Sequence, residues 1–235
     1  MTTVALESDY HDCYDVWLER EGDVCFSRVA EDSWSVSRSD MFHLFDTLGI
    51  DHPEFTQVLY VDPFKSWVVY VDAYAHCGEG KLLVTEGVFP QDADSCYASE
   101  YIPDFPGVSY RYFVVAGKGA WFKHWSTEDW KSNCGDGDLS PMTEGFQNQD
   151  YIEVACKFIK NPVYAIDFVA QRVPEGSSRL LAIDWNPAPR LAGTPAHDDM
   201  LGYFGSNQGI ARAISESVIS RLGSQGTLDN NKIIV

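Results

Sequence analysis

Basic residues are scarce in this 235-residue sequence, which has 17 Lys and Arg against 35 Asp and Glu and a formal net charge of −18. A surface this acidic repels nucleic-acid phosphates and anionic lipid, so we expect neither a nucleic acid nor a membrane as a partner. The acidity also has a plain alternative explanation, because net charge of one sign keeps a protein soluble.

Long apolar runs and paired cysteines are missing as well. No segment approaches the roughly 18 consecutive apolar residues that cross a bilayer. The first nine residues have neither the basic start nor the apolar stretch of a signal peptide. The six cysteines are spread along the chain without a Cys-x-x-Cys pair, which argues against a zinc site or a disulfide framework. We therefore expect reduced thiols and a cytoplasmic protein.

Apolar and aromatic residues are plentiful, at 45% and 14%, which is enough for a sizeable core. Helical spacing of apolar residues predicts helices at 41–49, 151–160 and 207–222, the first of them capped by Ser39 or Asp40 and ended by Gly49. β-Branched and aromatic runs predict the following strands: 58–61, 67–71, 82–85, 98–102, 110–116, 120–125, 163–170 and 179–184. Residues 1–38 are interpreted as short strands and turns, and the polar segment 126–148 as a long loop of the kind that is often functional. The fold class is therefore α+β.

Two carboxylates interrupt apolar strands in the C-terminal part of the chain. Asp167 and Asp184 each have apolar neighbours on both sides, and they lie about equally far from the centre of the turn at 174–178. If the two strands pair antiparallel around this turn, both carboxylates face one side, and Asn186 points the same way. Two carboxylates and an amide oxygen suit a hard cation, with phosphate oxygens completing an octahedral magnesium shell. A competing interpretation is that these acids are strand-end residues satisfied by turns.

The strings Ala165-Ile166-Asp167-Phe168 and Asp184-Trp185-Asn186-Pro187 resemble the C-terminal half of the ATP-grasp fold. In that superfamily an Asp strand precedes a strand carrying Glu-x-Asn-Pro, and these residues hold the magnesium ions of ATP. Other segments are similar to further parts of the fold in the same order: a helix with Gly-Ile-x-x-Pro at 41–53, a glycine-rich flap at 76–81, a hinge strand at 100–103, a phosphate-contacting strand at 110–118 and a phosphate loop at 129–137.

The resemblance implies an α+β, ATP-grasp-like fold in which two α+β lobes with antiparallel sheets hold a nucleotide between them. It divides the chain into four parts: a short N-terminal segment at 1–38, the N-terminal part with its flap hairpin at 39–103, a metal- and phosphate-binding lobe at 104–222, and a flexible tail at 223–235.

The resemblance also implies ATP and Mg²⁺ as cofactors, and a ligase that joins a carboxylate to an amine or thiol through an acyl phosphate. The implied substrate is a small-molecule or peptide carboxylate, and nothing indicates an oligomeric state. The residues that contact the nucleotide would be Lys65, Lys81, Glu100, Tyr101, Ile102 and Asn133. The catalytic positions would be Arg111, Lys131 and Arg190, and the metal ligands Asp167, Asp184 and Asn186.

Departures from the family pattern keep other functions open. Asp184 replaces the usual Glu, and Lys131 replaces a common Arg, which gives a point charge without bidentate geometry. Tyr70 stands where a Lys normally contacts the α-phosphate, although Lys65 or Lys81 are possible substitutes. The lobe ahead of residue 40, which usually helps hold the acceptor, is short. A second hypothesis is therefore a degenerate ATP-grasp protein that senses nucleotides or binds another protein, and a third is an unrelated acidic interaction protein.

Overall fold

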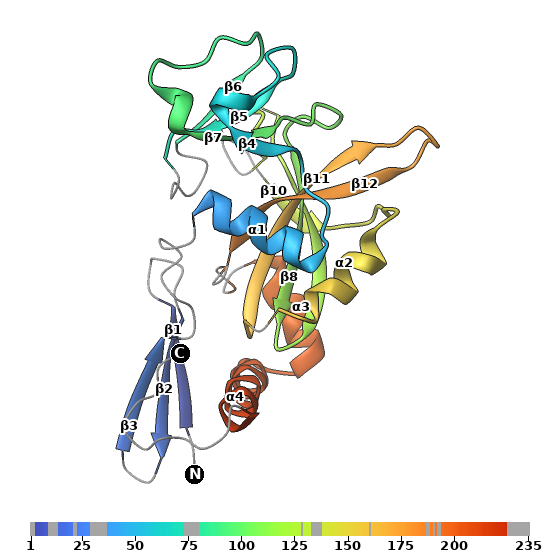
Figure 1. The fold of residues 1–235 in the computed structure, drawn as a ribbon. Coiled ribbons are helices and arrows are strands. Elements are labelled where there is room, and N and C mark those ends of the chain that lie inside the picture. The colour runs from blue at the N-terminus through green and yellow to red at the C-terminus, as the bar shows by residue number, and fades with distance from the viewer. Residues whose placement is uncertain are drawn as a thin grey trace.

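The computed structural model describes residues 3–8, 14–20, 23–28, 37–72, 80–127, 129–132, 138–159, 161–186, 189, 191 and 194–224. Within these residues the strands form three antiparallel sheets, with helices packed against them (Figure 1). The smallest sheet comes from the start of the chain and has the order β1-β2-β3. Its strands are β1 (Thr3–Ser8), β2 (Tyr14–Arg20) and β3 (Asp23–Arg28).

The largest sheet has five strands in the order β10-β9-β8-β11-β12. Their bounds are β8 (Val108–Val115), β9 (Lys118–Trp125), β10 (Asp138–Pro141), β11 (Val163–Arg172) and β12 (Ser178–Asn186). The central strands β8 and β11 coincide with two of the predicted apolar strands. Their residues are mostly apolar because other elements cover each strand on both faces. β10 is a correction to the predicted loop at 126–148, since it pairs with the end of β9 and extends the sheet.

The remaining sheet has four strands in the order β4-β7-β5-β6. Their bounds are β4 (Phe55–Gln57), β5 (Trp67–Tyr70), β6 (Lys81–Val84) and β7 (Tyr97–Glu100). The strand predicted at 58–61 is wrong: Val58–Tyr60 is a 3₁₀ turn, η2, and a second such turn, η3, spans Ala93–Ser95. Leu59 and Tyr60 are 62% and 70% exposed, so this apolar run has no sheet to cover it.

Four helices accompany these sheets in the described part of the chain: α1 (Arg38–Leu48), α2 (Gln149–Cys156), α3 (Pro195–Phe204) and α4 (Asn207–Ser224). α1 ends at Gly49 as predicted, in the left-handed conformation at φ 67°. It starts earlier than predicted, however, because the Ser37 hydroxyl, and not Ser39 or Asp40, accepts the capping hydrogen bond from a backbone amide. α3 was not predicted. Within the described residues we find no helix with the length and hydrophobicity that crossing a bilayer demands.

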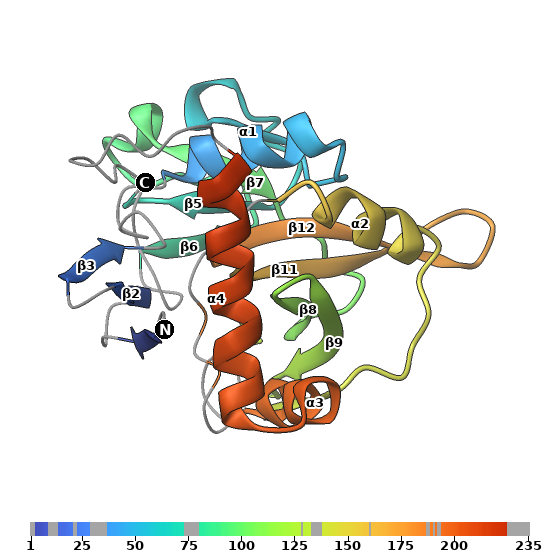
Figure 2. The ribbon, with the colours of Figure 1, turned by 90° about the horizontal axis from the view of Figure 1, so that it is seen from below.

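The two faces of the five-stranded sheet have different covers, because side chains alternate along each strand. On one face Phe168 and its even-numbered neighbours pack against α1 and α2, in a core that continues into the four-stranded sheet through Val68 and Tyr70. On the other face Phe113 and Ala165 pack against α3 and α4 (Figure 2). This second face continues along β11 to Asp167, so that residue lies beyond the helical cover.

Candidate functional site

Three charged side chains form a row across neighbouring strands of the five-stranded sheet. Arg111 on β8 is directly opposite Asp167 on β11, and Asp167 is directly opposite Asp184 on β12. The guanidinium of Arg111 donates two hydrogen bonds to Asp167, from Nε to Oδ1 at 2.7 Å and from Nη2 to Oδ2 at 2.8 Å. The two strands therefore do pair around the turn as expected, and they bring the two carboxylates side by side.

A one-residue shift in register places Asp184 in this row. On the turn side of the hairpin Phe168 pairs with Ala182, whereas the next pair is Asp167 with Asp184, so Ile183 has no partner of its own. Such a β-bulge re-aims the side chains around it. As a result Ile183 and Asp184 both line the same pocket, although consecutive residues of a regular strand point to opposite faces.

Asp184 is held by two cations from outside its own sheet. Arg38 on α1 donates from Nη1 to Oδ1 at 2.5 Å, and Lys81 on β6 donates from Nζ to Oδ2 at 3.2 Å. The backbone amide of Trp185 also donates to Oδ1, at 3.0 Å. Burial alone would raise the pKa of Asp184, but Lys81 and Arg38 outweigh it and hold that pKa well below the usual range. The carboxylate is therefore ionised at neutral pH.

Arg38 was not predicted as a site residue. It is only 5% exposed, its guanidinium lies 5.4 Å from the ring centroid of Tyr70, and burial would lower its pKa were it not for Asp184, which raises it. A signal for it exists in the sequence, because Arg38 precedes Met41 and Phe45 with helical spacing and so belongs to the buried face of α1. A charged residue on such a face requires a buried partner.

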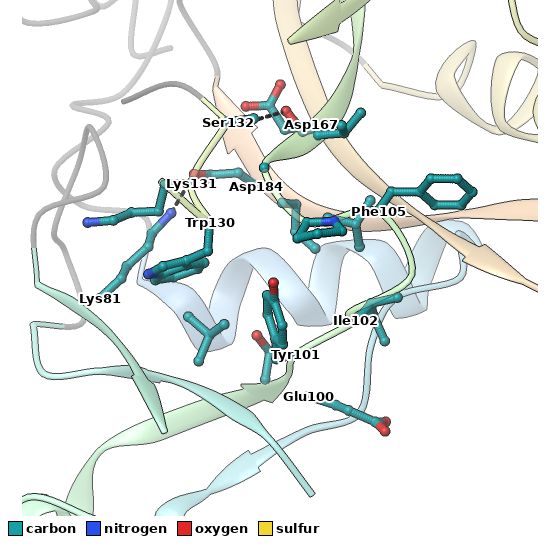
Figure 3. Close-up of a pocket in the computed structure, with 18 of the residues that line it drawn as sticks. Lys81, Glu100, Tyr101, Ile102, Phe105, Trp130, Lys131, Ser132, Asp167 and Asp184 are labelled. Carbon is teal, nitrogen blue, oxygen red and sulfur yellow. Dashed lines mark hydrogen bonds and ion pairs between the residues drawn. The ribbon is translucent and has the colours of Figure 1, made fainter. Parts of the chain in front are cut away.

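A pocket of about 90 Å³ lies between the two larger sheets, with Asp167 and Asp184 in its wall. Its apolar part includes Val68, Ile102 and Val169, from both sheets. Figure 3 shows Lys81 and Lys131 on the same side as Asp184. The pocket therefore joins an apolar wall to a charged end.

Seven predicted site residues line this pocket: Lys81, Glu100, Tyr101, Ile102, Lys131, Asp167 and Asp184. Aromatic rings complete the wall beside them, with Tyr101 and Trp130 in edge-to-face contact at 5.9 Å. The carboxylate of Glu100 points away from the two lysines in Figure 3 and makes an ion pair with Lys65 at 3.3 Å.

Other predicted residues lie elsewhere. Arg111 is next to the pocket, bound to Asp167, and Asn186 is on β12 opposite Ala165; neither is among the lining residues. Lys65 lies outside the pocket, where it also pairs with Glu54 at 2.7 Å. Two predicted positions, Asn133 and Arg190, fall outside the described residues.

Of the two lysines considered as replacements at the Tyr70 position, Lys81 is the one that reaches the pocket. It is directly opposite Tyr70 in the β5–β6 pair, and its ammonium contacts Asp184. Tyr70 itself is buried, with its hydroxyl 2.9 Å from Ser99 Oγ. The cation thus comes from the neighbouring strand instead of the strand that was expected to carry it.

The donor set at this site fits one kind of metal ion. No group of three or more His, Cys, Asp and Glu side chains gathers in the part of the chain that the structure describes. Magnesium, however, is usually bound by only one or two carboxylates together with substrate phosphates. The pair Asp167 and Asp184 meets that requirement, provided that phosphate oxygens complete the shell and one of the bound side-chain cations withdraws.

No family model matches the chain, and no curated protein matches its sequence. Among solved structures, it is similar to a D-alanine–D-alanine ligase from Bacillus anthracis in complex with ATP, with TM-score 0.55 and 12% identity over 82% of this chain and 69% of that one. The ATP-grasp ligase PsnB follows with TM-score 0.49 and 12% identity over 78% of this chain and 59% of its own. A peptide-bound ATP-grasp ligase from Chryseobacterium gregarium has TM-score 0.49 and 11% identity over 99% of this chain and 88% of its own.

Sequence identities this low support a similarity of fold alone. The D-alanine–D-alanine ligase, with its TM-score of 0.55, supports that similarity. The chain has the ATP-grasp fold, and the expected α+β class with antiparallel sheets is confirmed.

Proposed function

We propose that this chain binds ATP in the pocket between its two larger sheets and uses it to join a carboxylate to an amine or a thiol. The observation that carries the proposal is the composition of that pocket within an ATP-grasp fold. Lys81 from one sheet contacts Asp184, and Lys131 from the loop after β9 lines the same pocket, while an apolar wall lies beside them. A triphosphate requires cations, and a purine base requires an apolar slot.

The base would lie against the apolar wall, with the hinge residues Glu100, Tyr101 and Ile102 beside it. A volume of about 90 Å³ is smaller than the roughly 300–1,000 Å³ of ordinary ligand pockets. The pocket must therefore open when a nucleotide enters. Trp130 is a suitable reporter of that change, because it lines the pocket and its ring contacts Tyr101.

We propose Asp167, Asp184 and Asn186 as the magnesium ligands. Held by these residues, the ion would supply positive charge against the charge that develops during phosphoryl transfer. Arg111 has a supporting role in this scheme, because its two hydrogen bonds fix the orientation of Asp167.

The chemistry would proceed in two displacements. A substrate carboxylate, from a small molecule or a peptide, attacks the γ-phosphorus of ATP, which gives an acyl phosphate and ADP. An amine or thiol then attacks the acyl carbon, and inorganic phosphate leaves. Lys131 and Arg111 would steady the transferred phosphoryl group, and Arg190, which follows Asn186 in the sequence, would bind a carboxylate or phosphate of the substrate. Together they offset the repulsion between two anions, which is the main barrier to bringing these reactants together.

A nucleotide-binding protein without ligase activity is the second candidate, and one observation favours it. Both carboxylates are already neutralised by side-chain cations, Asp167 by Arg111 and Asp184 by Arg38 and Lys81. A site of this kind holds phosphate without necessarily activating it.

A two-stage experiment tests the proposal. Thermal denaturation is first followed with and without Mg-ATP, and we expect a rise in melting temperature that Asp184→Ala and Asn186→Ala remove in its magnesium-dependent part. Lys118→Met is the matched control and should keep the rise, because Lys118 is exposed at the start of β9 and does not line the pocket. No rise in the native chain would refute nucleotide binding. ADP release is then measured with a panel of carboxylic acids and amines: turnover supports the ligase, and binding without turnover supports the second candidate.

A further inference from the structure

The four carboxylate oxygens of Asp167 and Asp184 are engaged to different degrees. Both oxygens of Asp167 accept from the Arg111 guanidinium, at 2.7 and 2.8 Å. Oδ1 of Asp184 accepts from Arg38 and from a backbone amide. Oδ2 of Asp184 accepts from Lys81, at the longest distance of the set, 3.2 Å. Oδ2 is therefore the oxygen from which a partner is most easily displaced.

The two cations on Asp184 also differ in how firmly they are fixed. Arg38 is buried on α1 and is held further by the Tyr70 ring and by Met41, whose sulfur lies 3.6 Å from Nη1. Lys81 is at the first position of the edge strand β6 and carries a single compact charge on a flexible stem. When a ligand competes for Asp184, Lys81 yields before Arg38 does.

The charge at the site points in the same direction. Three ion-paired cations, Arg38, Lys81 and Arg111, face two carboxylates, and Lys131 in the same pocket adds to this excess of positive charge. A bare divalent cation would raise this excess, whereas a divalent cation that arrives with a triphosphate brings a net negative charge. The site therefore disfavours the metal alone and accepts it together with the nucleotide.

We propose that the Lys81 ammonium occupies the metal position on Asp184 before a nucleotide binds and is exchanged on ligand binding. The divalent cation of the nucleotide takes Oδ2, and the displaced ammonium binds a phosphate oxygen of that same nucleotide. No covalent bond changes in this step. The proposal rests on the proposed function for the location of the metal, and it gives Lys81 two opposite roles: a competitor of the metal and a ligand of the nucleotide.

These opposite roles make the test specific. In Lys81→Met, Mn²⁺ binding without nucleotide, followed by the loss of the free-ion electron paramagnetic resonance signal, should tighten about tenfold. ADP binding, followed by titration calorimetry at saturating Mg²⁺, should weaken about tenfold, because the displaced ammonium is then missing as a phosphate ligand. A tenfold change corresponds to roughly 1.4 kcal/mol. Lys118→Met is the control and should change neither value, because Lys118 is exposed at the start of β9 and does not line the pocket.

The outcomes separate this proposal from the function on which it rests. Unchanged or weaker Mn²⁺ binding in Lys81→Met overturns the exchange, even if ADP binds well to the native chain. Tighter Mn²⁺ binding that disappears in Lys81→Met/Asp184→Asn supports it and locates the ion on Asp184. If the native chain binds neither ADP nor ATP, the proposed function fails and the nucleotide half of the exchange fails with it. Lys81→Gln, which keeps a donor but no charge, should reproduce the metal effect if Lys81→Met folds poorly.

Discussion

Replacing Arg38 with methionine tests how far the buried cation supports the fold. Methionine has a long, unbranched side chain that can follow the path of the arginine stem beside Met41 and the Tyr70 ring. The substitution therefore removes the charge and the ion pair to Asp184 while leaving a small change in volume.

The expected loss of stability follows from the surroundings of Asp184. Removing one partner of a fully buried ion pair costs about 3–5 kcal/mol, because it strands the other charge. Here Asp184 keeps Lys81 and a backbone amide, and its side chain is 29% exposed, so we expect roughly 2–3 kcal/mol. For a chain of this size each kcal/mol lowers the melting temperature by about 2–4 °C, which predicts a fall of roughly 4–12 °C.

The assay is equilibrium urea unfolding of the native chain, Arg38→Met, Asp184→Asn and the double variant. The double variant should be more stable than the sum of the single losses predicts, by about 1 kcal/mol or more, because residues in direct contact are coupled. A loss below about 0.5 kcal/mol in Arg38→Met would show that the pair is worth no more than an exposed one.

The same pair predicts how stability depends on pH. An Asp whose pKa is lower in the folded chain adds stability above its unfolded value of about 3.9, and this contribution is lost as the pH falls through the lower folded value. Lys81 and Arg38 lower the pKa of Asp184 against the effect of burial, so the native chain should lose stability below about pH 4. The Arg38→Met variant should lose less stability over that pH range. An equal loss of stability would argue against Arg38 as a group that lowers the pKa of Asp184.

Three further predictions concern the frame around the site. Gly107→Ala should lower the free energy of unfolding by more than Gly176→Ala does. Both glycines have positive φ, but a Cβ added at Gly107 would lie 2.5 Å from a backbone oxygen, whereas a Cβ added at Gly176 would meet nothing within 4 Å. Equal losses in urea unfolding would show that the contact relaxes. Asn148→Ala should lower the free energy of unfolding by about 2 kcal/mol, because the Asn148 side-chain amide accepts from the N–H of Leu180 at 2.8 Å and donates to its C=O at 2.9 Å. Asn148→Asp keeps the acceptor and should lower it by less. Burial raises the pKa of the Cys156 thiol to about 12, so peptide mapping after iodoacetamide treatment at pH 8 should find Cys156 unmodified in the folded chain and alkylated after unfolding.

The elements that the sequence pattern predicted best are those whose burial is symmetric. β5, β8 and β11 are covered on both faces, so their apolar and β-branched runs reflect their surroundings directly. The same pattern misled at 58–61, where an apolar run remains on the surface. It also missed α3, whose buried residues are only Ala196 and Met200, too few for a helical period to stand out.

The site shows the same division. Asp167 and Asp184 could be paired from their distances to one turn, since the hairpin is local. The pairing of Asp184 with Arg38 and Lys81 could not be predicted, because these residues come from a helix and a sheet that are far away in the sequence. A choice between Lys65 and Lys81 likewise needed the strand register, which sets Lys81 opposite Tyr70.

Two of the departures from the ATP-grasp pattern, Tyr70 and Asp184, are physically connected to one another. Tyr70, which stands where a lysine was expected, contributes the ring beneath Arg38, and Arg38 binds the carboxylate of Asp184. Asp184 is one methylene shorter than the usual Glu, and its other oxygen accepts from the lysine directly opposite Tyr70. A lysine at position 70 would put a second cation against Arg38, and a longer acid at 184 would require the Arg38 and Lys81 contacts to rearrange. These residues therefore form one alternative arrangement of charge, so reverting any of them singly should weaken the site instead of restoring the common pattern.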